Sequence, residues 1–228
     1  RPFPFIVPSC GKTDVQPIFA GNYKKMKKWN TFYLLLVVVL AIVILKTSCM
    51  GDQKQDETTL KSKAVLENIA ERKSDRKYLK KSVEGDKIDA MVKAGMAAPS
   101  GMDRRPWEFV VVTDREALDS MAAKLPYAKM LTNAPLAIVV CGDTTRSSYW
   151  YLDCSAATQN VLLAAEALGL GAVWTAAYPY EDRIDVVRQN TGLPENIVPL
   201  CVIPIGYPDG PQKAKDKFDL QRVHRNKY

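Results

Sequence analysis

Histidine is the scarcest residue type in this 228-residue chain, and His224 is its one example. A Ser-His-Asp triad or a His-rich metal site is therefore not expected. The five cysteines form no CxxC pair and have no metal-site spacing. Cys141, Cys154 and Cys201 lie in apolar runs, where a free cysteine packs as a small hydrophobic side chain. We predict that these three are core residues.

The chain also lacks the common phosphate-binding fingerprints and a basic folded region. Neither GxGxxG nor GxxxxGK[ST] occurs, so neither a Rossmann nor a P-loop site is expected. The net charge is +7, but residues 1–49 hold seven basic side chains and one acidic one. Residues 50–228 hold 25 basic and 24 acidic side chains. The basicity thus belongs to the leader, and a nucleic-acid partner is not predicted.

The leader has the layout of a targeting segment. Basic residues at 24–28 precede an apolar run of about 14 residues that ends at Leu45, short for a bilayer span of about 20. Thr47-Ser48-Cys49 follows, and the whole resembles a bacterial lipoprotein signal with Cys49 as the lipidation candidate. Lys46 departs from that pattern, so an uncleaved N-terminal anchor is the alternative. Either predicts a membrane-associated protein.

The organisation along the chain follows from these shifts in composition. We predict an unassigned extension over 1–25, a signal or anchor over 26–49, a polar tether over 50–63 and one folded domain over 64–228.

Helices and short apolar strands alternate in the folded part. Helical spacing begins near Ala64, and further helices are predicted over 86–98, 115–124, 147–168 and 181–190. The helix over 147–168 is apolar on most faces and should be central and buried. Strands are predicted over 108–113, 136–141, 172–175 and 198–205, the first two as buried strands. Pro199 and Pro204 would place the last strand at an edge or an irregular position. The pattern predicts an α+β or α/β sandwich.

Three polar segments carry groups that suit a phosphate. In Arg72-Lys73-Ser74-Asp75-Arg76, alternate side chains would point the same way in an extended backbone. Two guanidiniums and a hydroxyl on one side could bind a phosphate, although a solvated charge run is the plain alternative. The loop 98–107 is rigid and rich in donors, and the lysines at 213, 215 and 217 alternate in the polar tail.

Four motifs in this order resemble the nitroreductase family of FMN-dependent oxidoreductases. They are the 72–76 segment, the 98–107 loop, Asp153 to Trp174 with Gln159-Asn160 and Leu168-Gly-Leu-Gly171, and Ile205-Gly-Tyr-Pro208. The resemblance implies an α+β, nitroreductase-like α/β sandwich with a central mixed sheet flanked by helices. It also implies a homodimer with an FMN at each of two sites between the subunits, and a C-terminal tail that wraps the partner.

The resemblance also assigns site residues. Residues 72–76 would hold the FMN phosphate, the ribityl chain and a ring edge, residues 99–101 would line the flavin, and residues 175–177 would lie near its reactive N5. Asp103 and Arg105 stand where the family often has Asn and Gln. Lysines of the tail would reach the phosphate, and Lys213 is an alternative member of that pair. The predicted cofactor-binding set is Arg72, Lys73, Ser74, Arg76, Pro99, Ser100, Gly101, Asp103, Arg105, Thr175, Ala176, Ala177, Lys215 and Lys217.

The implied activity is transfer of electrons from NADH or NADPH to a nitroaromatic, a quinone or a similar conjugated acceptor by a ping-pong mechanism. No catalytic side chain is predicted, because the chemistry takes place on flavin N5. Two alternatives stay open: a specialised relative of dehalogenase-like or flavin-consuming type, and a membrane-tethered flavin-binding protein without turnover. We expect Trp107 to be a packing residue, and Asp153, Gln159 and Asn160 to be buried polar anchors of the central helix.

Overall fold

The computed structural model describes residues 32–40, 56 and 58–228. The chain divides into two units, 1–61 and 62–228. In the first unit, residues 32–40 form a helix whose side chains are all exposed. None of the described helices has both the length and the apolar character to cross a membrane. Cys10, Cys49 and most of the predicted signal or anchor lie outside the described residues, so those predictions stay predictions.

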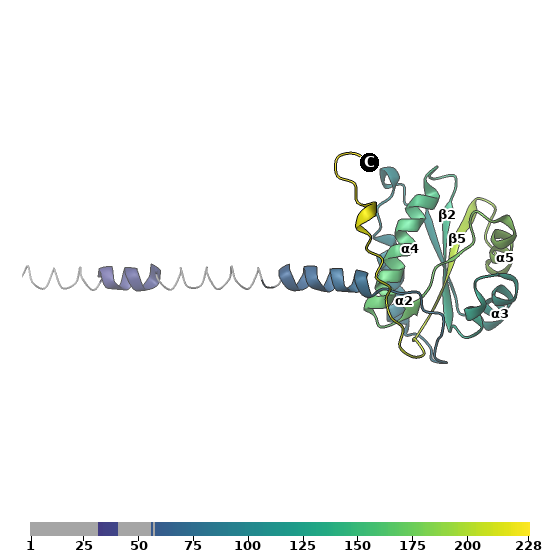
Figure 1. Ribbon diagram of the computed structural model, residues 1–228, viewed down its shortest axis with the longest axis horizontal. Coiled ribbons are helices and arrows are strands. Elements are labelled where there is room, and N and C mark those ends of the chain that lie inside the picture. The colour runs from purple at the N-terminus through teal and green to yellow at the C-terminus, as the bar shows by residue number, and fades with distance from the viewer. Residues whose placement is uncertain (1–31, 41–55, 57) are drawn as a thin grey trace, which may run out of the picture. The chain divides into compact units, whose positions relative to one another are not determined.

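A five-stranded sheet forms the centre of the second unit (Figure 1). Strands β1 (Trp107–Val112), β2 (Leu136–Asp143), β5 (Ile197–Gly206) and β3 (Gly171–Ala172) lie in that order, and β4 (Thr175–Ala176) also pairs with β5. Every pair of named strands in the described chain is antiparallel. The expectation of a mixed sheet is therefore wrong for these strands.

Helices cover both faces of the sheet. Helices α2 (Gly85–Met96) and α4 (Trp150–Ala167) lie on one face, and α3 (Arg115–Lys124) and α5 (Glu181–Thr191) lie on the other (Figure 1). The β2 strand shows why both faces are apolar: its side chains alternate between the core beneath α4 and the core beneath α3 and α5. A strand covered on both sides has no polar face, which explains its continuous apolar sequence.

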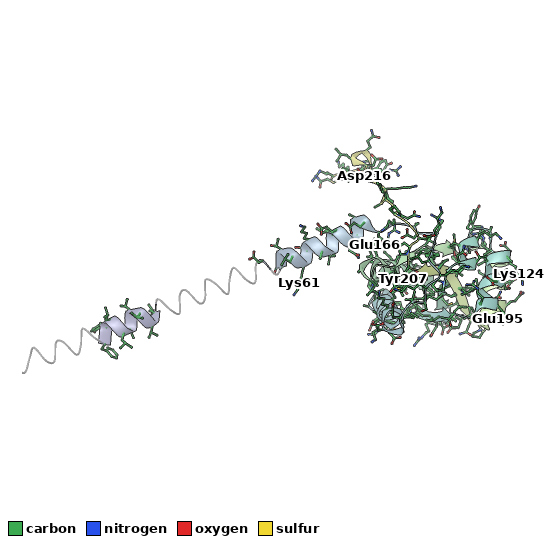
Figure 2. The ribbon with its side chains drawn as sticks, turned by 90° about the horizontal axis from the view of Figure 1, so that it is seen from below. Lys61, Lys124, Glu166, Glu195, Tyr207 and Asp216 are labelled. Carbon is green, nitrogen blue, oxygen red and sulfur yellow. The ribbon has the colours of Figure 1, made fainter. Side chains whose placement is uncertain are left out.

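The remaining elements are short or lie at the ends of the second unit. Residues 62–71, the second unit's part of a helix over 58–71, are helical, and three 3-10 turns are η1 (Gly101–Asp103), η2 (Lys129–Thr132) and η3 (Leu220–Arg222). Residues 209–228 are exposed, and Figure 2 shows the segment around Asp216 standing off the body of the domain.

Local sequence signals set several element boundaries as predicted. The Asp114 carboxylate caps α3 by accepting a bond of 2.9 Å from the Ala117 backbone N–H. Gly192 follows α5 with φ of +68°, a left-handed conformation that glycine adopts without steric cost. The buried cysteines 141, 154 and 201 confirm the predicted core role.

Of the two positions predicted for the last strand, the edge position is wrong and the irregular one is confirmed by a register shift beside Pro199. The β5 strand is central, with β2 on one side and β3 and β4 on the other. Each proline lies beside an interruption in the pairing with one neighbour, while Pro204 still pairs with Ala137 of β2. Pro199 lies opposite Cys141, just beyond a register shift between Val140 and Cys141, and Pro204 lies opposite the gap between β3 and β4. A central strand tolerates proline where no neighbour needs the missing N–H.

Two further strand predictions need correction. The predicted strand 172–175 is two short strands, because the chain leaves the sheet between Ala172 and Thr175. The β1 strand is only partly buried: Trp107 and Val112 are buried, whereas Glu108 and Val111 are exposed. It has a strand neighbour on one side only in the described sheet, so it is an edge strand.

Candidate functional site

A cationic cavity of about 600 Å³ lies where the C-terminal tail meets the segment after the first helix of the domain. Arg72 lines it from that segment, Gln159 from α4, and Lys215 and Lys217 from the tail. The tail also contributes the carboxylate of Asp216. Three cations against one carboxylate leave an excess of positive charge, and this donor set suits a phosphate. The structure therefore brings together the predicted phosphate-binding residues Arg72, Lys215 and Lys217.

Lys73 points away from this cavity to α4. Its ammonium forms an ion pair of 2.6 Å with Glu166, and both side chains are largely buried. Nearby, the Asn68 side chain donates a bond of 3.0 Å to the Leu163 carbonyl. These contacts fix the start of the 72–76 segment on the C-terminal half of α4.

Asp75 anchors the middle of the segment. Its side chain is 1% exposed, its N–H donates to the Ala172 carbonyl at 3.1 Å, and its carbonyl accepts a bond from the Tyr78 hydroxyl. Burial raises the pKa of the Asp75 carboxyl, and Lys73 partly opposes the rise. Because Asp75 points inward, Ser74 and Arg76 project outward into solvent, as the predicted alternation requires.

A second cavity, of about 460 Å³, lies at the outer end of the same segment. Arg76 lines it together with Thr175 and Ala176, which are the predicted ring-edge residues. The Thr175 hydroxyl donates to the Val202 carbonyl at 2.6 Å, so this side chain links β4 to β5. Ala177 is buried, and its N–H donates to Leu200. Ala176 is thus the exposed member of the predicted trio.

Sequence reasoning missed three polar or aromatic residues of the second cavity: Tyr127, Lys129 and Arg183. Each is an ordinary residue in its local sequence, and no motif marks any of them. The Lys129 ammonium donates to the carbonyls of Ala122 and Ala123 at 2.9 and 2.8 Å, at the end of α3. Tertiary packing alone brings these residues to Arg76.

The predicted loop 98–107 is held at the N-terminal end of α4. The Gly101 N–H donates to Asp153 Oδ1 at 2.9 Å, and the Ser147 hydroxyl donates to Asp153 Oδ2 at 3.0 Å. The Ser100 hydroxyl accepts a bond of 3.0 Å from the Arg105 N–H. The buried Asp153 is therefore a polar anchor, as predicted. Asn160 is a half-buried one that donates to the Ala94 carbonyl at 3.0 Å.

The backbone of this loop is unusual. Met102, Asp103 and Arg105 have φ of 52°, 54° and 46°, the left-handed region that costs a non-glycine residue on the order of 1 kcal/mol. The anchor on Asp153 offsets this cost. The result is a tightly determined loop whose residues 99–101 lie at the surface.

Asp103 and Arg105 bind each other. The Arg105 guanidinium donates to both oxygens of the Asp103 carboxylate, at 2.7 and 2.5 Å, and both side chains are exposed. These hydrogen bonds lower the pKa of the Asp103 carboxyl. The charges of the two side chains therefore cancel.

Within one chain, the predicted site residues form two separate groups. The loop is attached to α4 at Asp153, and the 72–76 segment is attached to it at Glu166. Thirteen residues of helix span about 20 Å along the axis. One copy of the chain therefore does not bring residues 99–105 to residues 72–76.

The other residues singled out from sequence have structural surroundings. Trp107 is buried in the core, as expected, and Gln159 is exposed beside the first cavity rather than buried. His224 stacks on Tyr228 at 4.2 Å between ring centroids. In the described parts of the chain, no group of His, Cys, Asp and Glu side chains could hold a metal ion.

The fold and the two cavities define a class: an α+β protein with two cationic cavities, one at each end of the 72–76 segment. The sequence profile of the nitroreductase family matches residues 69–125 and 118–207, more than half of the chain. The chain belongs to the nitroreductase family.

Known proteins share this fold over the whole domain. A crystal structure from Bacteroides thetaiotaomicron, provisionally named an NADH dehydrogenase/NAD(P)H nitroreductase, is 69% identical with a TM-score of 0.72, covering 72% of this chain and 98% of that one. A Methanothermobacter thermautotrophicus protein of the same provisional name is 46% identical over 167 residues, covering 72% of this chain and 87% of that protein.

The name of a third relative includes a cofactor. The structure of an FMN-dependent nitroreductase from Clostridium difficile is 34% identical with a TM-score of 0.68, covering 71% of this chain and 98% of that one. Together these findings confirm the expected family, the α+β fold and the enzyme class, an oxidoreductase.

Proposed function

We propose that this chain is an FMN-dependent oxidoreductase that passes electrons from NADH or NADPH to a small conjugated acceptor such as a nitroaromatic or a quinone. The observation that carries the proposal is the 72–76 segment, which contributes a cation to each of two cavities. Arg72 and Arg76 are four residues apart, or about 13 Å in an extended chain. This span suits a ligand with a phosphate at one end and a planar ring at the other.

The side chains present fit FMN in this orientation. Arg72, Lys215 and Lys217 would hold the phosphate, and Arg76 would lie at the ring edge beside Ala176. FMN supplies reversible hydride chemistry when it is bound. The chain supplies orientation and positive charge: Arg76 stabilises negative charge at the end of the ligand that it faces. No acid–base side chain is required at this site.

One cavity beside the ring edge would have to admit both the electron donor and the acceptor. We expect them to bind there in turn, which corresponds to a ping-pong mechanism. Initial rates measured at several fixed acceptor concentrations should then give parallel lines in double-reciprocal plots. Intersecting lines would show that donor and acceptor bind together.

A homodimer would complete the site. The apolar faces of the 62–71 helix, α2 and α4 border a groove of about 490 Å³, and Val65 and Ile69 on its rim are 59% and 49% exposed. Burying such surface against a second copy is favourable. A second copy could also bring its loop 99–101 to residues 72–76, and the exposed tail would wrap the partner.

Membrane attachment through residues 26–49 is part of the proposal and rests on the sequence. Mass spectrometry of the N-terminus of membrane-extracted protein distinguishes a lipidated Cys49 from an intact anchor. Recovery of the full chain from the soluble fraction, with Cys49 unmodified, would contradict both.

The cofactor proposal is tested with the purified full-length chain. We expect FMN titration to give a yellow protein whose visible absorbance is lost when NADH or NADPH is added without oxygen. Arg72→Ala should weaken FMN binding at least about tenfold, because a charge-assisted contact to the phosphate is lost.

Lys227→Ala is the matched control, since it removes a tail cation that does not line the cavity. It should leave FMN affinity unchanged. If the purified chain does not bind FMN, the proposal is wrong. A yellow chain that neither nucleotide bleaches would favour a flavin-binding protein without turnover.

A further inference from the structure

We infer that Arg183 selects redox substrates that carry an anionic group, a carboxylate or a phosphate, in the cavity beside Ala176. The inference rests on the proposed function and adds a substrate class to it. Arg183 lies on the first turn of α5, outside every motif that marks the family in this sequence.

The position of Arg183 is fixed by neighbours on two other segments. Its guanidinium lies over the Tyr180 ring, 3.7 Å from the centroid, and 5.4 Å from the centroid of Tyr127. Nη1 donates to the Ala176 carbonyl at 3.4 Å. Stacking on aromatic rings orients a guanidinium while leaving donors at its edge. Arg183 is thus held directly beside Ala176, one of the predicted ring-edge residues.

The charge of this cavity is one-sided. Among the described residues that line it, Arg76, Lys129 and Arg183 are cationic and none carries a carboxylate. Lys129 already donates to two carbonyls, and Arg76 belongs to the ring edge. Glu181 and Asp182 share the first turn of α5 but do not line the cavity. Arg183 is the cation left to bind a substrate.

Arg183 has donors to spare. A guanidinium has five N–H groups, and one is used on the Ala176 carbonyl. Its Nε is buried, so the donors left for a ligand are those of the two terminal nitrogens, Nη1 and Nη2. A planar carboxylate or a phosphate accepts from such a fork with two parallel bonds, which a neutral substituent cannot do.

The substrate anion proposed at Arg183 would bind at a different place from the phosphate of FMN. Arg72 and the tail lysines line the other cavity, at the opposite end of the 72–76 segment. Tyr127 and Tyr180, 71% and 48% exposed, offer aromatic surface beside Arg183. The cavity therefore fits an aromatic or nucleotide substrate with a negative group directed to Arg183.

The test compares 4-nitrobenzoate with its neutral methyl ester as acceptors, with NADH as donor. Arg183→Gln should raise KM for 4-nitrobenzoate about tenfold and leave the ester and the FMN content within about twofold. Arg188→Gln is the matched control: it removes the other cation of α5, which pairs with Asp185. It should leave both acceptors unchanged.

A second arm locates the source of the anion. With the neutral ester as acceptor, NADPH and NADH are compared in both variants. A selective loss with NADPH assigns the anion to the phosphate of the donor, and a selective loss with 4-nitrobenzoate assigns it to the acceptor. Equal effects of Arg183→Gln on all four combinations, or no effect on any, would overturn the inference.

A binding measurement separates this inference from the proposed function. Trp174 lines the cavity, so 4-nitrobenzoate should quench its fluorescence in the cofactor-free chain, and Trp174→Phe should remove that component. Arg183→Gln should weaken the quenching by 4-nitrobenzoate about tenfold and that by the ester little. The same titration with NADPH and NADH tests the donor's phosphate. If Arg183→Gln changes the quenching by neither 4-nitrobenzoate nor NADPH, the inference fails whether or not FMN binds.

Discussion

The 72–76 segment and the 99–105 loop have similar polar compositions but are built differently. The segment is fixed through inward contacts of Lys73 and Asp75, which leaves Arg72 and Arg76 to line cavities. The loop is fixed through its backbone, and its charged pair Asp103 and Arg105 is neutralised internally. The segment therefore offers positive charge to a ligand, whereas the loop offers shape and backbone groups.

The largest predicted effect is on FMN binding, when the 72–76 segment and the 99–105 loop each carry one substitution. Arg72→Ala and Gly101→Trp should each abolish most FMN binding as separate homodimers. In a mixed dimer with the loop supplied by the partner, one site carries both defects and the other carries none. We expect co-expressed, tag-purified mixed dimers to bind about half the wild-type FMN.

Absorbance measures this stoichiometry at an FMN concentration that fills the wild-type sites but leaves both variant homodimers largely empty. Mixed dimers without FMN would show that segment and loop of the same chain form the site. Light scattering of each sample gives the oligomeric state independently.

The next largest effect is expected on the free energy of unfolding, from removing the Asp153 carboxylate that anchors the loop. Asp153→Ala removes a buried carboxylate that accepts bonds from Gly101 and Ser147, and leaves both donors unpaired. We expect a loss of about 3 kcal/mol in the free energy of unfolding, measured with denaturant. Asp119→Ala, which removes an exposed carboxylate paired with Arg115, should cost no more than about 0.5 kcal/mol. Similar losses in the two variants would contradict the anchoring role.

The buried carboxyl of the segment should make stability depend on pH. Because the pKa of Asp75 is raised in the folded state, the folded chain binds more protons than the unfolded chain above about pH 4. This contribution to stability is therefore lost as pH rises from about 4 toward neutrality. Asp75→Asn should be more stable than the wild type at pH 7, with a difference that shrinks toward pH 4. A difference that grows on acidification would refute this assignment.

The smallest effect is expected at the exposed pair. Asp103→Asn and Arg105→Gln introduce neutral side chains, and the pair is exposed, so the unfolding midpoint should not move measurably. FMN affinity should change less than in Arg72→Ala. A larger effect on FMN affinity would show that the pair contacts the ligand and would make the loop a source of charge.

Most elements of the domain could be predicted from local sequence. Asp114 and Gly192 set helix ends, and the unbroken apolar run of β2 indicated a strand covered on both faces. These signals act between residues close in sequence, so periodicity and capping rules detect them. The position of β5 was not predictable in this way, since proline is excluded from a ladder only where a neighbour needs its N–H.

By itself, the sequence determined the order of the helices and strands, the family, the alternation of residues 72–76 and the need for positive charge around a phosphate. Only the tertiary structure decided which cations share a cavity. It brought Lys129 and Arg183 to Arg76, turned Lys73 to Glu166, and left the loop 99–105 at the other end of α4. The physical reason is range: caps and periodic faces depend on neighbours in the chain, whereas a cavity is formed by residues that meet only after the sheet and its helices pack.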